Sequence, residues 1–299
     1  MRQEDLADAD CGIAQTLGVV SDWWSWLIIR DIAGGATRFD QLQQSLGISR
    51  RALAERLASL AEHGLLRKTA YSQRPPRFDY LLTAKGEGLL PVLIAMQEFG
   101  DRHVMGDGSV TATAAAGSPE AQRVHELAGR AVPDLTLAAH DGTGVALRAM
   151  PGWRVLYFFP GAFAPDAQGY PPNWGEVPGA AGCTLESVTY AAHYAEFTAA
   201  GSEVLGVSTQ RPDQLAAFAA YAKLPFRLVS DQDGLLAAAL RLPVFRAAGT
   251  DRFKRQSLLL DPAGTVRFTQ MPITDPAASV TEMLTAVRRH AAGQPASGT

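Results

Sequence analysis

The first hundred residues place apolar side chains at helical spacing. Leu27, Ile28 and Ile32 fall on one side of the segment 22–35, which ends in two glycines, a common helix stop. Ser49 stands where an N-cap is expected, just before leucines spaced by three or four residues. Further helices are predicted over residues 11–20, 38–47, 48–66 and 84–104.

Between the last two of these helices the pattern changes to that of strands. Residues 65–71 and 77–83 are β-like, and the sequence SQRPP at residues 72–76 joins them. Two such runs with a short, proline-rich connection predict a β-hairpin. Short helices followed by a hairpin are the parts of an α+β winged helix-turn-helix domain, which we expect over residues 1–104.

The next stretch, residues 105–129, begins with small and polar residues, and we expect a linker there. Beyond it, strand-like and helical segments alternate. Strands are predicted at residues 153–159, 202–208, 225–230, 255–261 and 266–270. Helices are predicted at residues 183–201, 211–223, 233–242 and 276–291. This alternation predicts an α/β domain over residues 130–292 and a disordered tail at 293–299.

Composition supports two folded domains and excludes several classes of protein. Of the 299 residues, 47% are hydrophobic and 19% are charged, which is enough apolar material for packed cores. Two cysteines are too few for the disulfide framework of a small secreted protein. No apolar run has membrane-spanning length, and the first residues lack the apolar core of a signal peptide. We therefore expect a cytoplasmic protein without membrane contact.

Basic residues gather in one region of the chain, although its formal net charge is −3. Residues 37–85 carry nine Lys and Arg against four Asp and Glu, whereas residues 1–36 carry two against six. A basic patch on a helix-turn-helix is typical of a surface that binds double-stranded DNA. The candidate contacts on the recognition helix and hairpin are Ser49, Arg50, Arg51, Arg56, Arg74 and Arg77. An ordinary solvated basic helix and hairpin would carry the same charges.

The helices, the hairpin and the segment LTAKG at residues 82–86 follow one another in an order that resembles HxlR-type transcriptional regulators over residues 8–103. The resemblance implies a homodimer that binds operator DNA. It also implies a sensing thiol near the N-terminus, which here would be Cys11. Trp24 departs from the family, which usually has threonine there. The resemblance favours DNA binding over a merely solvated surface.

Cys183 stands at the start of a predicted helix, directly after the turn GAAG at residues 179–182. Free N–H groups and the positive end of a helix favour a thiolate, the form that attacks a peroxide O–O bond and becomes a sulfenic acid. Arg255, at the start of a predicted strand, is the candidate cation beside it. A buried structural cysteine is the alternative, because free cysteine is among the most buried residue types.

Several segments between residues 130 and 291, among them PGAAGCTLES and KRQSLLLDPAGTVRF, resemble a peroxiredoxin of the bacterioferritin-comigratory (Q-type) group. The resemblance implies a thioredoxin-like fold, a peroxide substrate and a thiol reductant. It also implies that Cys183 is the peroxidatic cysteine and that Arg255 activates it.

Three departures from the family pattern affect the expected chemistry. Ala180 stands where a threonine usually orients the peroxide, so Thr184 or a backbone group would have to serve. Val188 stands where a resolving cysteine is often found. The loop before the cysteine is longer than usual, so either Pro160 or Pro178 would cover the thiolate.

Together these features predict a dimeric, redox-responsive transcription regulator in which a DNA-binding domain is fused to a thiol-peroxidase-like domain. Oxidation of Cys183 would bias the geometry of the winged-helix dimer, and no haem, flavin or metal is required. One alternative is a working thiol peroxidase whose first domain only dimerises or localises it. Another is a regulator whose second domain has lost its chemistry and binds a ligand or partner.

Peroxide is expected to produce a disulfide between Cys11 and Cys183, within a chain or across the dimer, because the sequence holds no other thiol. The two Cα atoms must then come within about 7 Å of each other, so the domains must meet or rearrange. Peptide mass spectrometry under non-reducing conditions, after stoichiometric peroxide, detects the cross-linked peptide. A mixed disulfide with an added thiol, with Cys11 free throughout, would instead establish a one-cysteine cycle.

Overall fold

The computed structural model describes residues 10–293 apart from 21, 149 and 166–168. The chain divides into two compact units, Met1–Leu93 and Ile94–Thr299. The division falls before the expected boundary at residue 104.

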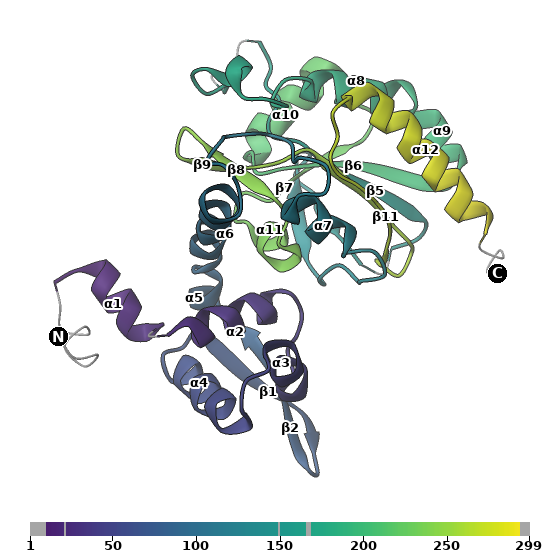
Figure 1. The fold of residues 1–299 in the computed structure, drawn as a ribbon. Coiled ribbons are helices and arrows are strands. Elements are labelled where there is room, and N and C mark those ends of the chain that lie inside the picture. The colour runs from purple at the N-terminus through teal and green to yellow at the C-terminus, as the bar shows by residue number, and fades with distance from the viewer. Residues whose placement is uncertain (1–9, 21, 149, 166–168, 294–299) are drawn as a thin grey trace. The chain divides into compact units, whose positions relative to one another are not determined.

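Helices and a hairpin build the first unit (Figure 1). Its helices are α1 (Gly12–Val19), α2 (Trp23–Ala33), α3 (Phe39–Leu46), α4 (Arg50–Glu62) and α5 (Ala84–Glu87). The helix α6 (Leu90–Phe99) begins in this unit and continues into the second. The strands β1 (Leu66–Gln73) and β2 (Pro76–Leu82) pair antiparallel. This arrangement confirms the predicted helix-turn-helix and its hairpin.

The core of the first unit is made by apolar faces of α2, α3 and α4. The leucines of α4 are buried as expected; they are Leu53, Leu57 and Leu60. In α2 the buried apolar residues are Ile28, Ile29 and Ile32, whereas Leu27 is only half-buried. The inward face of α2 is therefore rotated relative to the prediction.

Among the described residues, the second unit contains a mixed sheet with the strand order β11-β10-β5-β6-β7-β3-β4. Its strands are β3 (Thr136–Ala139), β4 (Gly144–Ala146), β5 (Trp153–Phe158), β6 (Ser202–Ser208), β7 (Arg227–Ser230), β10 (Gln256–Leu260) and β11 (Val266–Gln270). The central pairs β5–β6 and β6–β7 are parallel, and the outer pairs are antiparallel. A separate hairpin is formed by β8 (Val244–Ala247) and β9 (Thr250–Phe253). The sheet confirms the expected thioredoxin-like fold, although β3, β4, β8 and β9 were not predicted.

Helices α8, α9, α10 and α12 pack on one face of this sheet, where Figure 1 shows α8, α9 and α12 side by side. The helices of the second unit are α7 (Pro119–His125), α8 (Cys183–Ala192), α9 (Tyr194–Ala199), α10 (Pro212–Ala222), α11 (Leu235–Leu240) and α12 (Pro276–Ala292). The predicted single helix at 183–201 is broken at His193. Tyr157 lies at the centre of the buried face, and Gly206 on the adjacent strand leaves it room, because a Cβ there would lie 2.6 Å from the tyrosine oxygen.

The segment expected to be a linker, residues 105–129, is instead part of the second unit. Ala112 is fully buried, and α7 buries Ala121 and Val124. A run of small residues looks like a flexible linker in sequence. Small residues also permit close backbone contacts, and this property lets the segment pack into the second unit. The tail beyond Gly293 lies outside the described residues.

Candidate active site and DNA-binding surface

Cys183 is the first residue of α8 and follows a tight turn. Gly182 before it has a φ of 101°, in the left-handed region that favours glycine, and a Cβ there would lie 2.8 Å from Pro276 Cγ. Cys183 is 2% exposed, and its thiol donates to the carbonyl oxygen of Ala180 at 3.5 Å. The sulfur therefore lies buried at the positive end of a helix.

The Arg255 guanidinium contacts this sulfur from the connection between β9 and β10. Its Nη2 donates to Cys183 Sγ at 3.3 Å, and to the carbonyl oxygens of Ala181 at 3.1 Å and Gly179 at 3.3 Å. Its Nη1 donates to the Glu186 carboxylate. Arg255 is 1% exposed, so these contacts act at low local dielectric, where they are stronger than in water. The structure brings together the cysteine and the arginine that the sequence paired.

Glu186 belongs to this cluster and was not anticipated. It follows Cys183 by three residues, which places both on one face of α8, and it is fully buried. Burial raises the pKa of the Glu186 carboxyl to about 7, against the attraction of Arg255, which lowers it. Burial alone would lower the pKa of Arg255, but Glu186 and Cys183 together raise it above its usual value. The signal in the sequence that pointed to Glu186 was its place one helical turn after Cys183, the candidate nucleophile.

Three further positions discussed from the sequence lie on α8 or just before it. Ala180 is fully buried. Thr184 is half-buried as the second residue of α8, and its proposed role in orienting peroxide stays a prediction. Val188 is 38% exposed, so the position at which the family often has a resolving cysteine faces outward.

A short stretch of backbone, residues 110–113, crosses between the two halves of the site; we call it the bridging segment. The N–H of Ala112 donates to the carbonyl oxygen of Pro178 at 2.8 Å, in the loop before Cys183. The carbonyl oxygen of Ala112 accepts the backbone N–H of Arg255, also at 2.8 Å. One fully buried alanine therefore connects the cysteine loop with the arginine.

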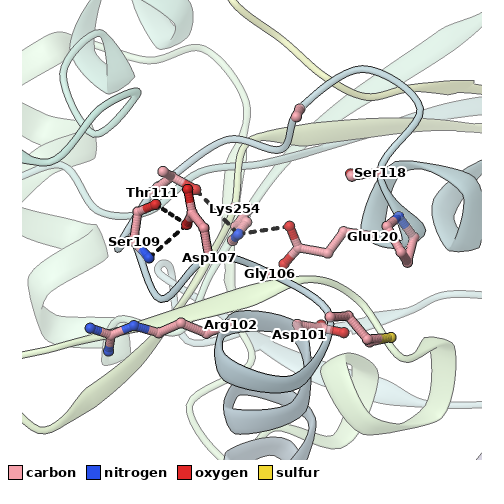
Figure 2. Close-up of a pocket in the computed structure, with 12 residues that line it drawn as sticks. Asp101, Arg102, Gly106, Asp107, Ser109, Thr111, Ser118, Glu120 and Lys254 are labelled. Atoms are coloured by element: carbon pink, nitrogen blue, oxygen red, sulfur yellow. Dashed lines mark hydrogen bonds and ion pairs between the residues drawn. The ribbon is translucent and has the colours of Figure 1, made fainter.

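A cavity of about 520 Å³ lies beside the bridging segment (Figure 2). Residues between 101 and 120 line it together with Lys254. The Lys254 ammonium donates to Glu120 Oε2 at 2.8 Å and to Thr111 Oγ1 at 3.3 Å. Burial raises the pKa of Glu120, although Lys254 lowers it. Lys254 thus lines this cavity, and the next residue, Arg255, contacts the sulfur.

The predicted recognition helix is α4, and its first turn is exposed. The Ser49 hydroxyl accepts a backbone N–H of that turn at 3.2 Å, which confirms it as the N-cap. Arg50 lies 3.1 Å from Asp40, and Arg51 lies 2.9 Å from Glu55. Exposed ion pairs of this kind contribute little to stability. Both guanidinium groups can therefore exchange these partners for phosphates at little cost.

The other basic candidates differ in their surroundings. Arg56 lies 3.0 Å from Asp22, the residue that caps α2. Arg74 and Arg77 are exposed at the tip of the hairpin. A cleft of about 560 Å³ opens between the hairpin and the starts of α3 and α4, and its basic lining residues are Arg38, Arg50 and Arg77.

Cys11 is exposed at the N-cap position of α1, and its thiol is free. Cys183 belongs to the other unit and is likewise free. The disulfide between them stays a prediction.

Two protein families match separate parts of the chain. The HxlR-like helix-turn-helix family matches residues 19–107, and the AhpC/TSA family matches residues 177–269. The protein MalR of Fusobacterium mortiferum is 33% identical over 95 residues, which are 31% of this chain and 90% of MalR. The chloroplastic peroxiredoxin Q of Gentiana triflora is 32% identical over 143 residues, which are 46% of this chain and 56% of that protein.

The chain belongs to the HxlR family in its first part and to the AhpC/TSA peroxiredoxin family in its second. A solved structure of Xanthomonas campestris peroxiredoxin Q is 27% identical, covers 55% of this chain and 99% of its own, and has a TM-score of 0.44. The HxlR domain is also similar to a regulator of Mycobacterium bovis, at 36% identity, of whose length the chain spans 58%. Both halves of the chain thus match only part of some of their relatives.

The candidate sites fall within the two family matches. The peroxiredoxin match includes Cys183, Glu186 and Arg255, and the HxlR match includes the basic positions of α4 and the hairpin. In the part of the chain that the structure describes, no helix is both long and apolar enough to cross a membrane.

Replacing Arg255 by methionine is expected to slow the oxidation of Cys183 by peroxide about 10- to 100-fold, since a hydrogen bond to a charged group contributes roughly 1.5–3 kcal/mol. The change also leaves Glu186 buried without its cation, which should lower the free energy of unfolding by about 3–5 kcal/mol. Arg255→Met combined with Glu186→Gln should regain part of that stability but not the rate. Loss of free thiol and urea unfolding measure the two quantities.

Arg246→Met is the matched control, because Arg246 is 45% exposed and pairs with Asp251 within the hairpin of β8 and β9. It should change neither quantity appreciably. Oxidation of the Arg255→Met protein at the wild-type rate would rule out support of the thiolate by the guanidinium.

Proposed function

We propose that this protein is a DNA-binding regulator whose affinity for its operator responds to peroxide. The observation that carries the proposal is the bridging segment, in which Ala112 is hydrogen-bonded to the loop before Cys183 and to Arg255. This segment follows the HxlR domain in the chain, so a change at the sulfur has a short covalent and hydrogen-bonded route toward the DNA-binding part.

The chemical step is oxidation of Cys183 at its sulfur. The thiolate attacks one oxygen of the peroxide, the O–O bond breaks, and Cys183 becomes a sulfenic acid. The leaving oxygen carries away the electron pair of that bond and takes up a proton to become water or an alcohol. Arg255 donates to the sulfur and supports its negative charge. Since Val188 replaces a nearby resolving thiol, either Cys11 or an external thiol reduces the sulfenic acid.

Oxidation of Cys183 changes the surrounding structure because there is little space around the sulfur. Cys183 is 2% exposed, so an added oxygen must displace neighbours, of which Arg255 and the loop at 179–182 are the first. Ala112 is hydrogen-bonded through its backbone to Arg255 and to Pro178, the residue directly before this loop. Each such bond contributes about 1 kcal/mol. Breaking both would shift a two-state equilibrium roughly 30-fold.

DNA is recognised by the exposed start of α4 and by the hairpin. In this proposal Ser49, Arg50 and Arg51 enter the major groove, while Arg74 and Arg77 contact the backbone or minor groove. Arg56 is assigned to holding α2 through Asp22 and not to DNA.

The proposed active form is a homodimer. Large apolar side chains of α1 and of the first residue of α2 are exposed, with Ile13 at 75% and Trp23 at 61%. Apolar side chains that are this exposed are available for an interface between subunits. A second copy of the HxlR domain is the partner that its family resemblance implies.

A second candidate function, turnover of peroxide as a thiol peroxidase, is favoured by the paired Cys183, Arg255 and Glu186. The two functions use the same first step. They differ in whether reduction by a thiol is fast and repeated or slow enough to leave the oxidised form populated.

Replacing both Arg50 and Arg51 by alanine should weaken DNA binding and reduce the slope of log affinity against log salt by about 1 for each phosphate that the protein no longer neutralises. Fluorescence anisotropy with operator DNA at several salt concentrations measures both. Arg56→Ala serves as the control from the same helix, and we expect it to reduce the unfolding free energy while the salt slope stays the same. Unchanged affinity and slope in the double variant would contradict this docking.

Peroxide should change the operator affinity of the wild-type protein and leave that of Cys183→Ser unaltered. Insertion of four Gly/Ser residues between Gly106 and Asp107, both exposed, should remove the response, because it separates the bridging segment from the HxlR domain. Oxidation of Cys183 itself should proceed in the insertion variant. A full response in that variant would show that the signal takes another route.

A further inference from the structure

Arg252 is a second arginine near the reaction centre, and among the described residues it has no acidic partner. It lies on β9 and is 7% exposed. Its Nη1 donates to the carbonyl oxygen of Pro160 at 3.3 Å. Its Nε is buried and has no acceptor among the residues that the structure describes. Burying a guanidinium donor without an acceptor is costly, so the presence of Arg252 here calls for a physical reason.

The surroundings of Arg252 are aromatic and neutral. The guanidinium carbon lies 5.2 Å from the centre of the Trp174 ring and 5.9 Å from that of Phe163. These rings stabilise a cation through their faces but do not replace the oxygen acceptors that a guanidinium binds. Gly161 allows the approach, because a Cβ there would lie 2.9 Å from Arg252 Nη1.

Arg252 is also coupled to the sulfur. Burial lowers the pKa of its guanidinium, while the charge of Cys183 raises it. Ala162, next in the chain to Gly161, packs in the same buried cluster as Cys183. Arg255 already donates to the sulfur, two carbonyl oxygens and Glu186, whereas Arg252 donates to one carbonyl oxygen. Of the two arginines, Arg252 is the better placed to bind an added anion.

We propose that Arg252 binds a carboxylate of the substrate, so that the peroxide preferred at Cys183 is an organic hydroperoxide that carries a carboxylate group. The hydrocarbon part of such a molecule would contact Trp174 and Phe163. The proposal rests on the proposed reaction of Cys183 with peroxide and adds the class of peroxide.

The reaction leaves the carboxylate unchanged. The Cys183 thiolate attacks the terminal oxygen of the hydroperoxide, the O–O bond breaks, and the sulfur becomes a sulfenic acid. The alkoxide that leaves takes up a proton, and the product is the corresponding hydroxy acid. Arg252 contributes by binding and orienting the molecule, while Arg255 supports the sulfur.

The test compares cumene hydroperoxide with its para-carboxylate derivative, two molecules with the same reacting group. Reduced protein is mixed with each in a single turnover without any reductant, and loss of the Cys183 thiol is followed by mass spectrometry. We expect the carboxylate form to react about 10- to 100-fold faster, the range given by hydrogen bonds to a charged group. A ratio near one in the wild-type protein overturns the proposal, whatever the variants do.

Variants then assign the preference to one side chain. Arg252→Gln should bring the ratio of the two rates close to one, because the rate with the carboxylate form should fall much further than the rate with cumene hydroperoxide. Arg252→Lys, which keeps the charge but loses the fork, should retain part of the preference. Arg246→Gln, on the paired strand β8 but bound to Asp251, should retain all of it. An equal loss of both rates in Arg252→Gln would show a structural role and overturn the proposal.

Two further outcomes separate this proposal from its premise. If neither peroxide oxidises Cys183, the proposed reaction itself fails. If cumene hydroperoxide oxidises Cys183 without a preference for the carboxylate form, only the assignment of Arg252 fails. If a carboxylate on the thiol reductant increases the rate of turnover and a carboxylate on the peroxide does not, Arg252 binds the reductant. That result would overturn the assignment to peroxide.

Discussion

The buried charge of Arg255 is the constraint on which the active site of the peroxiredoxin domain depends. A guanidinium that is 1% exposed must have its donors satisfied within the protein, or the domain loses several kcal/mol. Glu186 supplies the counter-charge, the turn before α8 supplies carbonyl oxygens, and Cys183 supplies its sulfur. The requirement that holds the arginine therefore also fixes the position of the nucleophile.

Two arginines three residues apart illustrate how different surroundings give one residue type different uses. Arg255 donates to an acid, a sulfur and two carbonyl oxygens. Arg252 has one carbonyl oxygen, two aromatic rings and no acid among the described residues. The first is suited to support a charge that forms on the protein. The second is suited to receive a charge that arrives from outside.

Local patterns in the sequence anticipated much of the fold. The leucine stripe of α4 and the Ser49 cap were predicted, because helix periodicity and capping depend on residues close in sequence. Arg255 was a candidate partner of Cys183 from its place at the start of a predicted strand, but resemblance to a family was needed to favour the pairing, since 72 residues separate them. Glu186 was missed because an acid on a helix is usually exposed and only tertiary packing buries it. Ala112 was missed because its contribution is made by its backbone, which every residue has.

The position of Ala112 also affects how separable the two domains are. Residues 108–176 lie outside both family matches, yet this interval contains Ala112, the cavity residue Glu120 and the aromatic rings around Arg252. The interval is therefore not a spacer, although neither family match includes it. A cut at its end, after residue 176, would separate the peroxide-reacting residues from part of the interior of their own unit. The limits of a family match therefore do not mark the limits of the folded unit, which here runs from Ile94 to Thr299.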